Sequence, residues 1–490
     1  MDAALRGELD AARAGRVYEL GRDATVAFTL ALNNHIAALT GVRVAVSPGP
    51  HTPSGSIPAF AKGSTGKKHH KKPGAREGHE GHRRAVPIPD RVETIEETRL
   101  CPECKGPVLP MRPNRRRKRT IEDIPQDLKT ETVEYSIPQQ WCPCCKKNVE
   151  PGVAAALPGA TIGNGVVALT TVMHYGLGLT IDQVREVFVS HLRTPLSAGG
   201  LVDLWRRAGE VLAPWYAQIG REARASATLH ADETGWRVNG DTHWLWCFCN
   251  QVNCYYLIDE SRGSDVLKEF FAEAFKGVLM SDFWGPYQSV VLEGEGARQC
   301  CLAHLLRELD HVDKDHLPGK PPDRAREWND FVKMLRRLLR DGIRLRKRPD
   351  FIAGRKTTHA SKITLIDRRL IALARGDAAK QGGYDDPDAA RLAKRLSRHR
   401  DELFTFLDRP EADWNNNFAE RQIRPAVILR KNSQCNRSQR GAATQAVLMS
   451  IHRTLKLRGH DPRAAIENAL RTYAATSALP PLPSPVVAIG

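Results

Sequence analysis

The sequence contains no run of about 18 apolar residues, the length that a membrane-spanning helix requires. Residues 1–16 alternate charged residues with alanine and have no apolar core, so no signal peptide is expected. The chain has eleven cysteines, an odd count, without a secretory signal. These absences argue against a disulfide framework and predict a protein of the reducing cytoplasm with no membrane partner.

The chain is strongly basic. Lys and Arg total 73 against 56 Asp and Glu, which gives a formal charge of +17. A large protein this basic usually binds a polyanion, most often nucleic acid. A basic enzyme without such a partner remains the alternative. With 490 residues, of which 41% are hydrophobic, the chain is expected to form about three domains with real cores.

The N-terminal part of the chain changes composition several times. Residues 1–45 carry apolar residues at roughly helical spacing and predict an N-terminal helix. Residues 46–98 are rich in Pro, Gly, Ser, His and Lys and predict a basic, flexible segment. Residues 160–220 look helical, with Thr180 and Ser197 as N-caps; a helix-turn-helix and a plain helical linker are equally open there.

Residues 99–152 form a small cysteine-bearing module. Cys101 and Cys104 make one Cys-x-x-Cys pair, and Cys142 and Cys145 make a second, with 142 − 104 − 1 = 37 residues between them. Four thiolates in two such pairs give the closed tetrahedral site of a structural zinc ion. Buried free cysteines are the alternative, and Cys144 is a spare thiol.

The spacer of this module has two features of its own. A small hairpin is expected at residues 130–137. A basic run within the spacer suggests DNA-phosphate contacts, with a merely solvated face as the alternative; it consists of Arg115, Arg116, Arg117, Lys118 and Arg119.

Residues 225–460 predict a mixed α/β domain. Asn239-Gly240 is a strong hairpin signal. The expected strands are 228–232, 244–249, 254–258, 277–282 and 298–303, with a helix at 264–275 and a helical insertion at 305–412. Residues 461–490 are expected to form a C-terminal helix and tail, disordered after residue 478.

Three acidic residues of this domain are candidate metal ligands. Asp232 and Asp282 each end a predicted strand, and adjacent strand ends place such carboxylates side by side. Paired carboxylates repel unless a cation lies between them, and their oxygens suit Mg²⁺. Glu420, near the start of a predicted helix, is the third candidate, although a surface ion pair with Arg424 is the simpler interpretation. Glu233 faces the opposite side of the strand and is a poorer ligand.

These motifs resemble the transposases of insertion sequence family 66, and the resemblance covers most of the chain. Phe283 stands where that family usually has glycine. The matching segments are 73–82, the two cysteine pairs, Asp232-Glu233-Thr234 with Trp236, Asp282 with Gly285 and Tyr287, Cys301-Leu302-Ala303-His304 with Arg307, and 416–425 continuing to Arg430-Lys431-Asn432.

The resemblance implies a ribonuclease H-like core with Asp232, Asp282 and Glu420 as its acidic ligands. The expected protein is therefore a multidomain α/β enzyme, with a helical insertion in its catalytic core, a small zinc-binding domain and an N-terminal helix. Two Mg²⁺ or Mn²⁺ ions would serve cleavage and strand transfer of DNA. DNA contacts are expected from Arg421, Arg424, Arg430 and Lys431.

The family also implies partners and a location. The substrates would be the ends of the element and a target DNA, and accessory proteins from the same element can be required. Pairing two DNA ends calls for a homo-oligomer, and the setting is the bacterial cytoplasm at the nucleoid. His304 is either a core histidine or a contact of the scissile phosphate.

Two other functions remain open at this point. One is a non-catalytic zinc-containing DNA-binding protein, a domesticated transposase, which binds DNA and cuts nothing. The other is a structure-specific nuclease, which cuts DNA and does not join pre-cut ends to a target.

Overall fold

The computed structural model describes residues 88, 92, 104–107, 128–352 and 359–486. Within this part, Tyr135–Glu186 and the residues from Leu196 onward belong to one compact unit, and Val187–Pro195 with the residues before Tyr135 belong to another. The predicted N-terminal helix, Cys101, the basic run at 115–119 and all but two residues of the predicted flexible segment lie outside the described residues.

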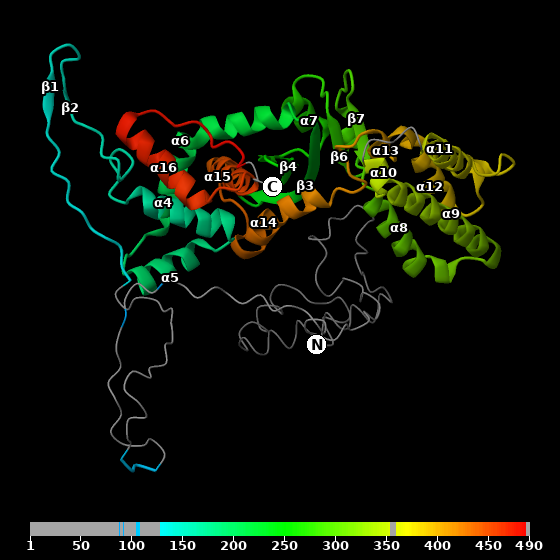
Figure 1. Ribbon diagram of the computed structural model, residues 1–490, viewed down its shortest axis with the longest axis horizontal. Helices are drawn as coiled ribbons and strands as arrows, with labels where there is room; N and C mark the ends of the chain where they lie inside the picture. The colour runs from blue at the N-terminus through cyan, green and yellow to red at the C-terminus, as the bar shows by residue number, and fades with distance from the viewer. Residues whose placement is uncertain (1–87, 89–91, 93–103, 108–127, 353–358, 487–490) are drawn as a thin grey trace, which may run out of the picture. The chain divides into compact units, whose positions relative to one another are not determined.

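A five-stranded mixed sheet lies at the centre of the larger unit (Figure 1). Its strands are β3 (Thr228–Val238), β4 (Asp241–Cys249), β5 (Cys254–Asp259), β6 (Val278–Ser281) and β7 (Ala297–Cys300). Their spatial order is β5-β4-β3-β6-β7, antiparallel between β3, β4 and β5 and parallel from β3 to β7. The predicted α/β class and all five predicted strands are therefore present.

The hairpin between β3 and β4 turns at Asn239 and Gly240, as the sequence predicts. Both residues have positive φ, 53° and 88°, which is the backbone of the tight hairpin turn that Asn-Gly favours. β3 nevertheless runs to Val238 and does not end at Asp232, because β4 stays paired with it along its whole length.

The two faces of the sheet carry different helices. Leu229, Ala231 and Leu279 share an apolar cluster with α7 (Ser264–Phe271), which includes Phe270 and Phe271. Val278 and Met280 point the other way, into a second cluster formed with the helical insertion. Alternate residues of β3 and β6 thus face opposite layers, as the two-residue repeat of a strand requires.

Long helices from both ends of this unit pack against the sheet. They are α6 (Ala198–Arg224), α14 (Asn417–Ser433) and α15 (Gln439–Leu457), with α4 (Asn164–Thr171) and α16 (Pro462–Thr476) beside them. Ser197 caps α6 by accepting the backbone N–H of Gly200 at 3.0 Å, as predicted. Thr180 precedes α5 (Ile181–Leu192) in a reciprocal cap with Gln183. α6 buries one face against α15 and β5, and so joins the core of the sheet.

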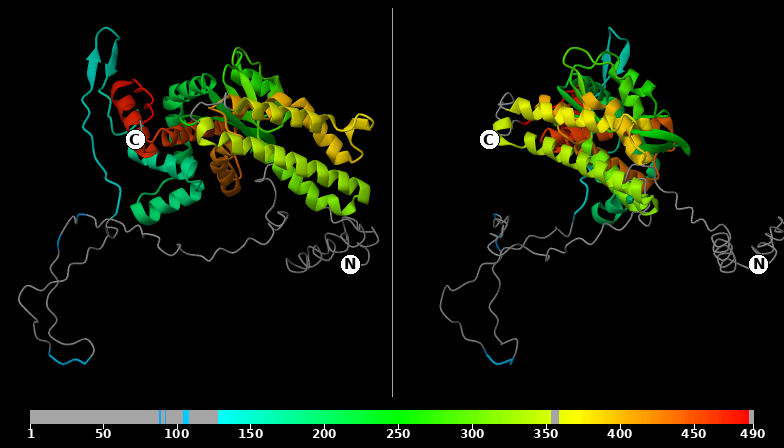
Figure 2. Two further views of the ribbon diagram at one scale, coloured as in Figure 1. Left: turned by 45° about the vertical axis from the view of Figure 1, so that its right-hand side comes forward. Right: turned by 90° about the vertical axis from the view of Figure 1, so that its right-hand side faces the viewer.

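The predicted insertion is helical. It comprises α8 (Leu302–Asp315), α9 (Pro322–Arg346), α10 (Pro349–Ile352), α11 (Ala360–Arg375), α12 (Pro387–Arg398) and α13 (Thr405–Asp408). Figure 2 shows α9 and α11 lying side by side. One continuous apolar cluster joins Met280 of the sheet to Trp328 and Phe331 of α9 and to Leu396 of α12. The insertion therefore shares its core with the sheet.

The predicted disorder after residue 478 is wrong for the part that the structure describes. The carbonyl of Pro480 accepts the indole N–H of Trp215 at 2.7 Å, and that of Pro483 accepts Arg458 Nη1 at 2.7 Å. Leu482 is buried between these anchors. Proline lacks an N–H but keeps its carbonyl, so a proline-rich segment can still be fastened through its acceptors.

The predicted hairpin at residues 130–137 is also absent. These residues form no strand, and all but Thr130 of them are exposed. A short hairpin lies instead at β1 (Gln140–Cys142) and β2 (Lys147–Val149), where Cys142 pairs with Lys147. The apolar alternation of residues 130–137 has no second surface to cover it, and a strand needs one.

No helix in the described ranges is long and apolar enough to cross a membrane.

The insertion core gives a test of stability. Phe331 is fully buried on α9, so Phe331→Ala is expected to destabilise the insertion by about 3–5 kcal/mol. Native-state hydrogen exchange of the full chain measures this local free energy of opening. Met334→Ala on the same helix, where the side chain is 51% exposed, is the matched control and is expected to change it by about 0.5 kcal/mol or less. Equal effects of the two changes would refute the shared core.

Candidate active site and nucleic-acid surface

Asp232 lies on β3, and Asp282 directly follows β6, the parallel neighbour of β3. Residues 228–230 of β3 lie opposite residues 278–280 of β6, and each pair differs by 50 positions (278 − 228 = 50). Continued by two residues, this register brings Asp232 level with Asp282, directly after β6 ends. The even-numbered side chains of β3 and β6 face the insertion and α14, and both aspartates continue this even-numbered series.

Glu420 joins this face through the first turn of α14. The residue before the helix, Asn416, fixes where the helix begins. Its Nδ2 donates to the carbonyl of Ala231 at 2.8 Å, its Oδ1 lies 2.8 Å from His230 Nδ1, and its backbone N–H donates to Cys301 Sγ at 3.1 Å. Asn416 is buried and ties β3, the end of β7 and α14 together. The side-chain Oδ1 of Asn415 accepts the backbone N–H of Asn417, the first residue of α14, at 3.0 Å.

Glu233 lies on the opposite face, as predicted. Its Oε1 accepts two bonds from Arg262, at 3.0 and 2.7 Å, and its Oε2 accepts the hydroxyl of Tyr287 at 2.5 Å. The Arg262 guanidinium lies between two indole rings, 4.5 Å from that of Trp244 and 4.0 Å from that of Trp284. Both carboxylate oxygens of Glu233 are therefore used by protein groups.

Asp232 and Asp282 keep one oxygen each for another partner. Asp232 Oδ1 accepts the N–H of Glu233 at 3.0 Å, and Asp282 Oδ1 accepts that of Trp284 at 2.8 Å. Among the described residues, neither Oδ2 accepts a hydrogen bond or forms an ion pair. This division separates the two aspartates from Glu233.

The electrostatics of the cluster are unfavourable for three charges without a cation. Burial raises the pKa of Asp232 well above its usual range, and the charges of Glu233, Asp282 and Glu420 raise it further. Burial also raises the pKa of Asp282, which the hydrogen bond from Trp284 partly offsets. Such mutual repulsion is what a bound cation would relieve.

The three acids are not in mutual contact. In the described part of the chain, one group of three His, Cys, Asp or Glu side chains has all its ligand atoms within 4.8 Å of one another. That group is Cys300, His399 and Glu402, and the three acids do not form such a group. Glu420 instead accepts a hydrogen bond from Arg307 at 2.6 Å and lies 3.8 Å from His304 Nε2. The alternative ion pair between Glu420 and Arg424 is not formed.

The four basic residues predicted on α14 divide into two kinds. Arg421, Arg424 and Lys431 are exposed. Arg430 is half-buried; its Nη1 donates to Thr234 Oγ1 at 3.1 Å and also to the carbonyl of Gly235. Arg430 thus binds α14 to β3. The side chains of Arg421, Arg424 and Lys431 are exposed to solvent instead.

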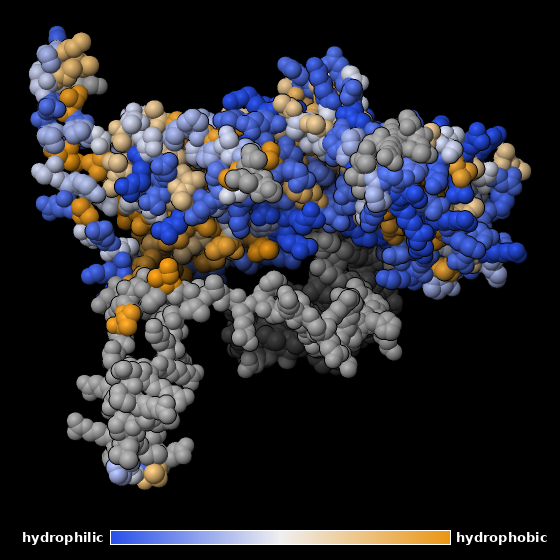
Figure 3. Space-filling model, in the orientation of Figure 1, coloured by the Kyte–Doolittle hydropathy of each residue, from blue (hydrophilic) through white to orange (hydrophobic). Residues whose placement is uncertain are grey.

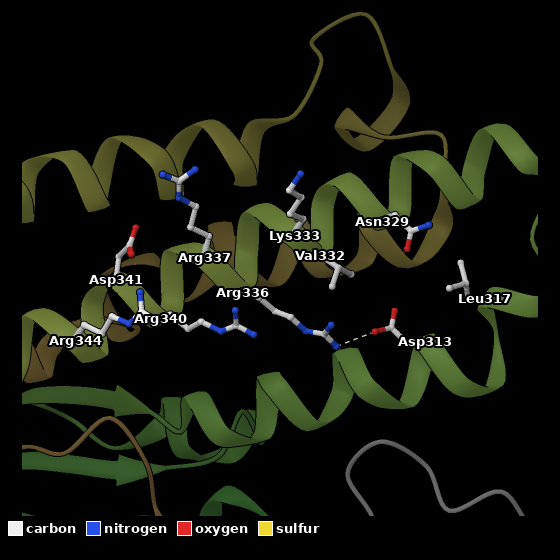
Figure 4. Close-up of a pocket in the computed structure, with 10 residues that line it drawn as sticks. All are labelled: Asp313, Leu317, Asn329, Val332, Lys333, Arg336, Arg337, Arg340, Asp341 and Arg344. Carbon is white, nitrogen blue, oxygen red and sulfur yellow. Dashed lines mark hydrogen bonds and ion pairs between the residues drawn. The ribbon is translucent and has the colours of Figure 1, made fainter. Parts of the chain in front are cut away.

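A basic groove lies between α8 and α9, in the insertion (Figure 4). Its volume is about 740 Å³, and the face of the insertion seen in Figure 3 is mostly hydrophilic. Five cations on one face of α9 line the groove: Lys333, Arg336, Arg337, Arg340 and Arg344. Two acids, Asp313 of α8 and Asp341 of α9, also line it, so the net charge of the lining is 5 − 2 = +3.

The acids of this groove are already neutralised. Asp313 pairs with Arg336 at 2.8 Å, and Asp341 pairs with Arg369 of α11 at 3.1 Å. Among the described residues, the other four groove cations form no ion pair. These four cations, from Lys333 to Arg344, span 344 − 333 = 11 residues, roughly 16 Å along the helix axis. This length is similar to the rise of about five base pairs of double-stranded DNA.

Of the four predicted zinc ligands, the described residues include Cys104, Cys142 and Cys145. Cys142 ends β1, and its Sγ accepts the backbone N–H of Cys145 at 3.4 Å. Hydrogen bonds from Cys145 and Cys144 lower the pKa of the Cys142 thiol and favour the thiolate that binds metals.

Sequence reasoning missed several residues of this region. Asn416 stands out in the sequence only as part of the matching segment 416–425, because its contacts are with residues 115 to 186 positions away. The Trp–Arg–Trp stack around Arg262 carries no sequence signal. The groove was detectable, since Lys333, Arg337, Arg340 and Arg344 recur at helical spacing.

Comparison with known proteins gives one family and several relatives. The family model described as "Transposase IS66 family" matches residues 159–444, which is 444 − 159 + 1 = 286 positions. In Sinorhizobium fredii, the uncharacterized protein y4jD is 24% identical over 397 residues, 76% of this chain and 74% of that protein. The uncharacterized protein y4qI of the same organism is 26% identical over 286 residues, 51% of each chain.

The matched segment contains the whole sheet, the helical insertion and the three acidic residues, and it covers more than half of the 490 residues. The chain therefore belongs to the IS66 family of transposases.

Proposed function

We propose that this chain is a metal-dependent transposase that cleaves DNA at the ends of an insertion sequence and joins them to a target. The observation that carries the proposal is the register that brings Asp232 of β3 level with Asp282, directly after the neighbouring parallel strand β6, on the face where α14 presents Glu420. The strand order β5-β4-β3-β6-β7 is consistent with the ribonuclease H-like core that the family implies.

The donor atoms fit hard divalent cations. Asp232, Asp282 and Glu420 offer carboxylate oxygens only, which suits Mg²⁺ or Mn²⁺. Two such ions lie about 4 Å apart in sites of this kind, so their ligands can be spread more widely than the ligands of a single ion. Bound there, the ions would polarise the scissile phosphate and activate the attacking water or 3′-hydroxyl.

The residues of the chain contribute position and charge. Asn416 fixes the start of α14, and with it the backbone of Glu420. Arg307 holds the Glu420 carboxylate and is half-exposed, so its remaining N–H groups can bind a DNA phosphate. His304 Nε2 lies 3.8 Å from the same carboxylate, beyond hydrogen-bond distance. No Ser or Tyr nucleophile is assigned, because hydrolysis and transesterification at phosphorus need no covalent enzyme intermediate.

DNA would contact two described surfaces. Arg421, Arg424 and Lys431 lie on the helix that carries Glu420, and the basic groove of α9 lies on the insertion. Both surfaces are suited to contacts with phosphates rather than bases, because they present exposed Arg and Lys side chains. The basic run at 115–119 remains a third proposed contact.

The proposal keeps a structural zinc ion at Cys101, Cys104, Cys142 and Cys145. The tight turn at Cys142–Cys145 and the lowered pKa of Cys142 support that role. A homo-oligomer is proposed because two DNA ends must be held together.

The acid cluster predicts a dependence of stability on pH and metal. The pKa of Asp232 is raised in the folded chain, so the folded state binds its proton more tightly than the unfolded state does. This carboxyl therefore stabilises the fold at pH values below its unfolded pKa, and the stabilisation is lost as the pH rises through its folded pKa. At neutral pH without divalent ions, Asp232→Asn is expected to raise the melting temperature, by roughly 2–4 °C for each 1 kcal/mol relieved. Mg²⁺ is expected to stabilise the unmodified chain and not the variant.

Calorimetry with and without Mg²⁺ measures both effects. Asp241→Asn, an exposed acid at the start of β4, is the control and should leave the melting temperature and its response to Mg²⁺ unchanged. A lower melting temperature for Asp232→Asn without metal would show that the acids do not repel one another.

Catalysis is tested with DNA that carries the ends of the element. Asp232→Asn, Asp282→Asn and Glu420→Gln are each expected to lower the cleavage rate in Mg²⁺ at least about 100-fold, because metal-bound charge stabilisation is worth several kcal/mol. Asp241→Asn should cleave normally.

The same assay separates the alternatives. Cleavage that survives Asp232→Asn would exclude the proposed site. A chain that binds these ends and never cuts them is a non-catalytic DNA-binding protein. Cleavage without insertion of pre-cut ends would identify a nuclease.

The groove on α9 is tested by the salt dependence of DNA binding. Replacing Arg337 and Arg340 by Gln is expected to reduce the slope of log affinity against log salt by about two, one for each lost phosphate contact. Fluorescence anisotropy on an Asp232→Asn background measures binding without cleavage. Lys456→Gln with Arg463→Gln, exposed cations on α15 and α16, is the control for lost charge. An unchanged slope for the α9 variant would exclude the groove as a DNA contact.

A further inference from the structure

Three potential metal ligands of different chemistry meet outside the acid cluster. Cys300 is the last residue of β7, His399 directly follows α12, and Glu402 ends the short helix η8 (Arg400–Glu402). Their ligand atoms all lie within 4.8 Å of one another. Cys300 and His399 are separated by 399 − 300 = 99 positions, so the fold and not local sequence brings them together.

The distances are close to those of a tetrahedral site. Cys300 Sγ lies 3.8 Å from His399 Nδ1 and 3.4 Å from Glu402 Oε2, and Nδ1 lies 2.7 Å from that Oε2. Zinc bonds of about 2.0–2.3 Å put neighbouring ligand atoms roughly 3.3–3.6 Å apart. Two separations already match within a few tenths of an ångström. The third separation is the hydrogen bond between His399 Nδ1 and Glu402 Oε2; zinc bound at Nδ1 would replace it, the neutral ring would carry its proton on Nε2, and the two atoms would move slightly apart.

The surroundings hold these side chains in place. Cys300 and His399 are 2% and 4% exposed. Gln288 Nε2 donates to Glu402 Oε2 at 2.9 Å, and Arg298 Nη1 lies 3.8 Å from Oε1. The ring of Phe283 meets that of His399 edge-on, with centroids 5.3 Å apart. Metal ligands are commonly oriented by such neighbouring hydrogen bonds and packing.

We propose that Cys300, His399 and Glu402 bind a zinc ion that joins the insertion to the sheet. A thiolate, an imidazole and a carboxylate together suit zinc, whereas magnesium takes oxygen ligands. On binding, the Cys300 thiol releases its proton to solvent, and the charges of zinc, thiolate and carboxylate sum to 2 − 1 − 1 = 0. Within the described residues no fourth His, Cys, Asp or Glu converges on the group, so water completes the site.

The site would connect the insertion to the active-site strands. Cys300 pairs with Ser281 in the sheet, and Ser281 precedes Asp282. His399 and Glu402 belong to the turn that brings the insertion back to the sheet. A zinc ion here would therefore fasten the returning end of the insertion beside a proposed catalytic aspartate, whether or not the chain transposes DNA.

The experiment must separate this site from the proposed zinc site of the cysteine module. The full chain with Cys142→Ser and Cys145→Ser lacks one pair of that module, and adding Asp232→Asn removes a ligand of the proposed magnesium site, so the chain with all three changes serves as the background. After loading with Co²⁺ and desalting, the background is expected to retain one ion per chain, with the visible absorption of tetrahedral cobalt and charge transfer from one thiolate. Adding Cys300→Ser or His399→Asn should abolish both signals.

Matched controls remove the same side chains elsewhere. Cys435→Ser and His316→Asn, each on the background, should retain one ion per chain and the spectrum. Glu402→Gln keeps the size of the side chain and is expected to weaken binding, with loss of the ion on dialysis. Near-ultraviolet circular dichroism of each variant shows whether it has folded, and only folded variants are compared.

A background chain that folds and retains no cobalt would overturn the proposal and leave a hydrogen-bonded cluster only. Retention of the ion by folded Cys300→Ser and His399→Asn chains would overturn it as well, because the metal would then lie elsewhere.

Discussion

The buried side chain of Asn416 is the constraint on which the candidate active site depends. It reaches the carbonyl before Asp232, the ring of His230 and the thiol of Cys301, and it also sets the first residue of α14. Burying an amide costs little free energy when all its donors and acceptors are hydrogen-bonded. Removing the amide would leave its buried partners without hydrogen bonds, which destabilises the fold. The position of Glu420 relative to Asp232 therefore follows from one residue that belongs to neither strand nor helix.

Most of the fold could be predicted from the sequence because its signals are local. The Asn239-Gly240 turn, the alternation in β4 and the cap at Ser197 each depend on neighbours a few residues away. The failures occurred where distant partners decide the outcome. β3 continues past Asp232 because β4 remains beside it, and the segment after residue 478 is ordered because Trp215 and Arg458 bind its carbonyls.

The site was predictable in part. The shared face of the two aspartates and the opposite orientation of Glu233 follow from the two-residue period of a strand. The burial of Glu233 by Arg262 and Tyr287 does not, since these partners lie 29 and 54 positions away. The acid spacing, the choice of Arg307 by Glu420 and the meeting of Cys300 with His399 are equally properties of the folded chain.

The helical insertion shares one apolar cluster with β6, and that continuity has a mechanical meaning. A lobe with its own core can swing on its connections while the sheet stays still. Here Phe331 of α9 belongs to the same buried cluster as Met280, which lies two residues before Asp282. Packed side chains therefore connect the helix that carries the basic groove to the strand that precedes a proposed metal ligand, and we expect the insertion and this strand to move as one body.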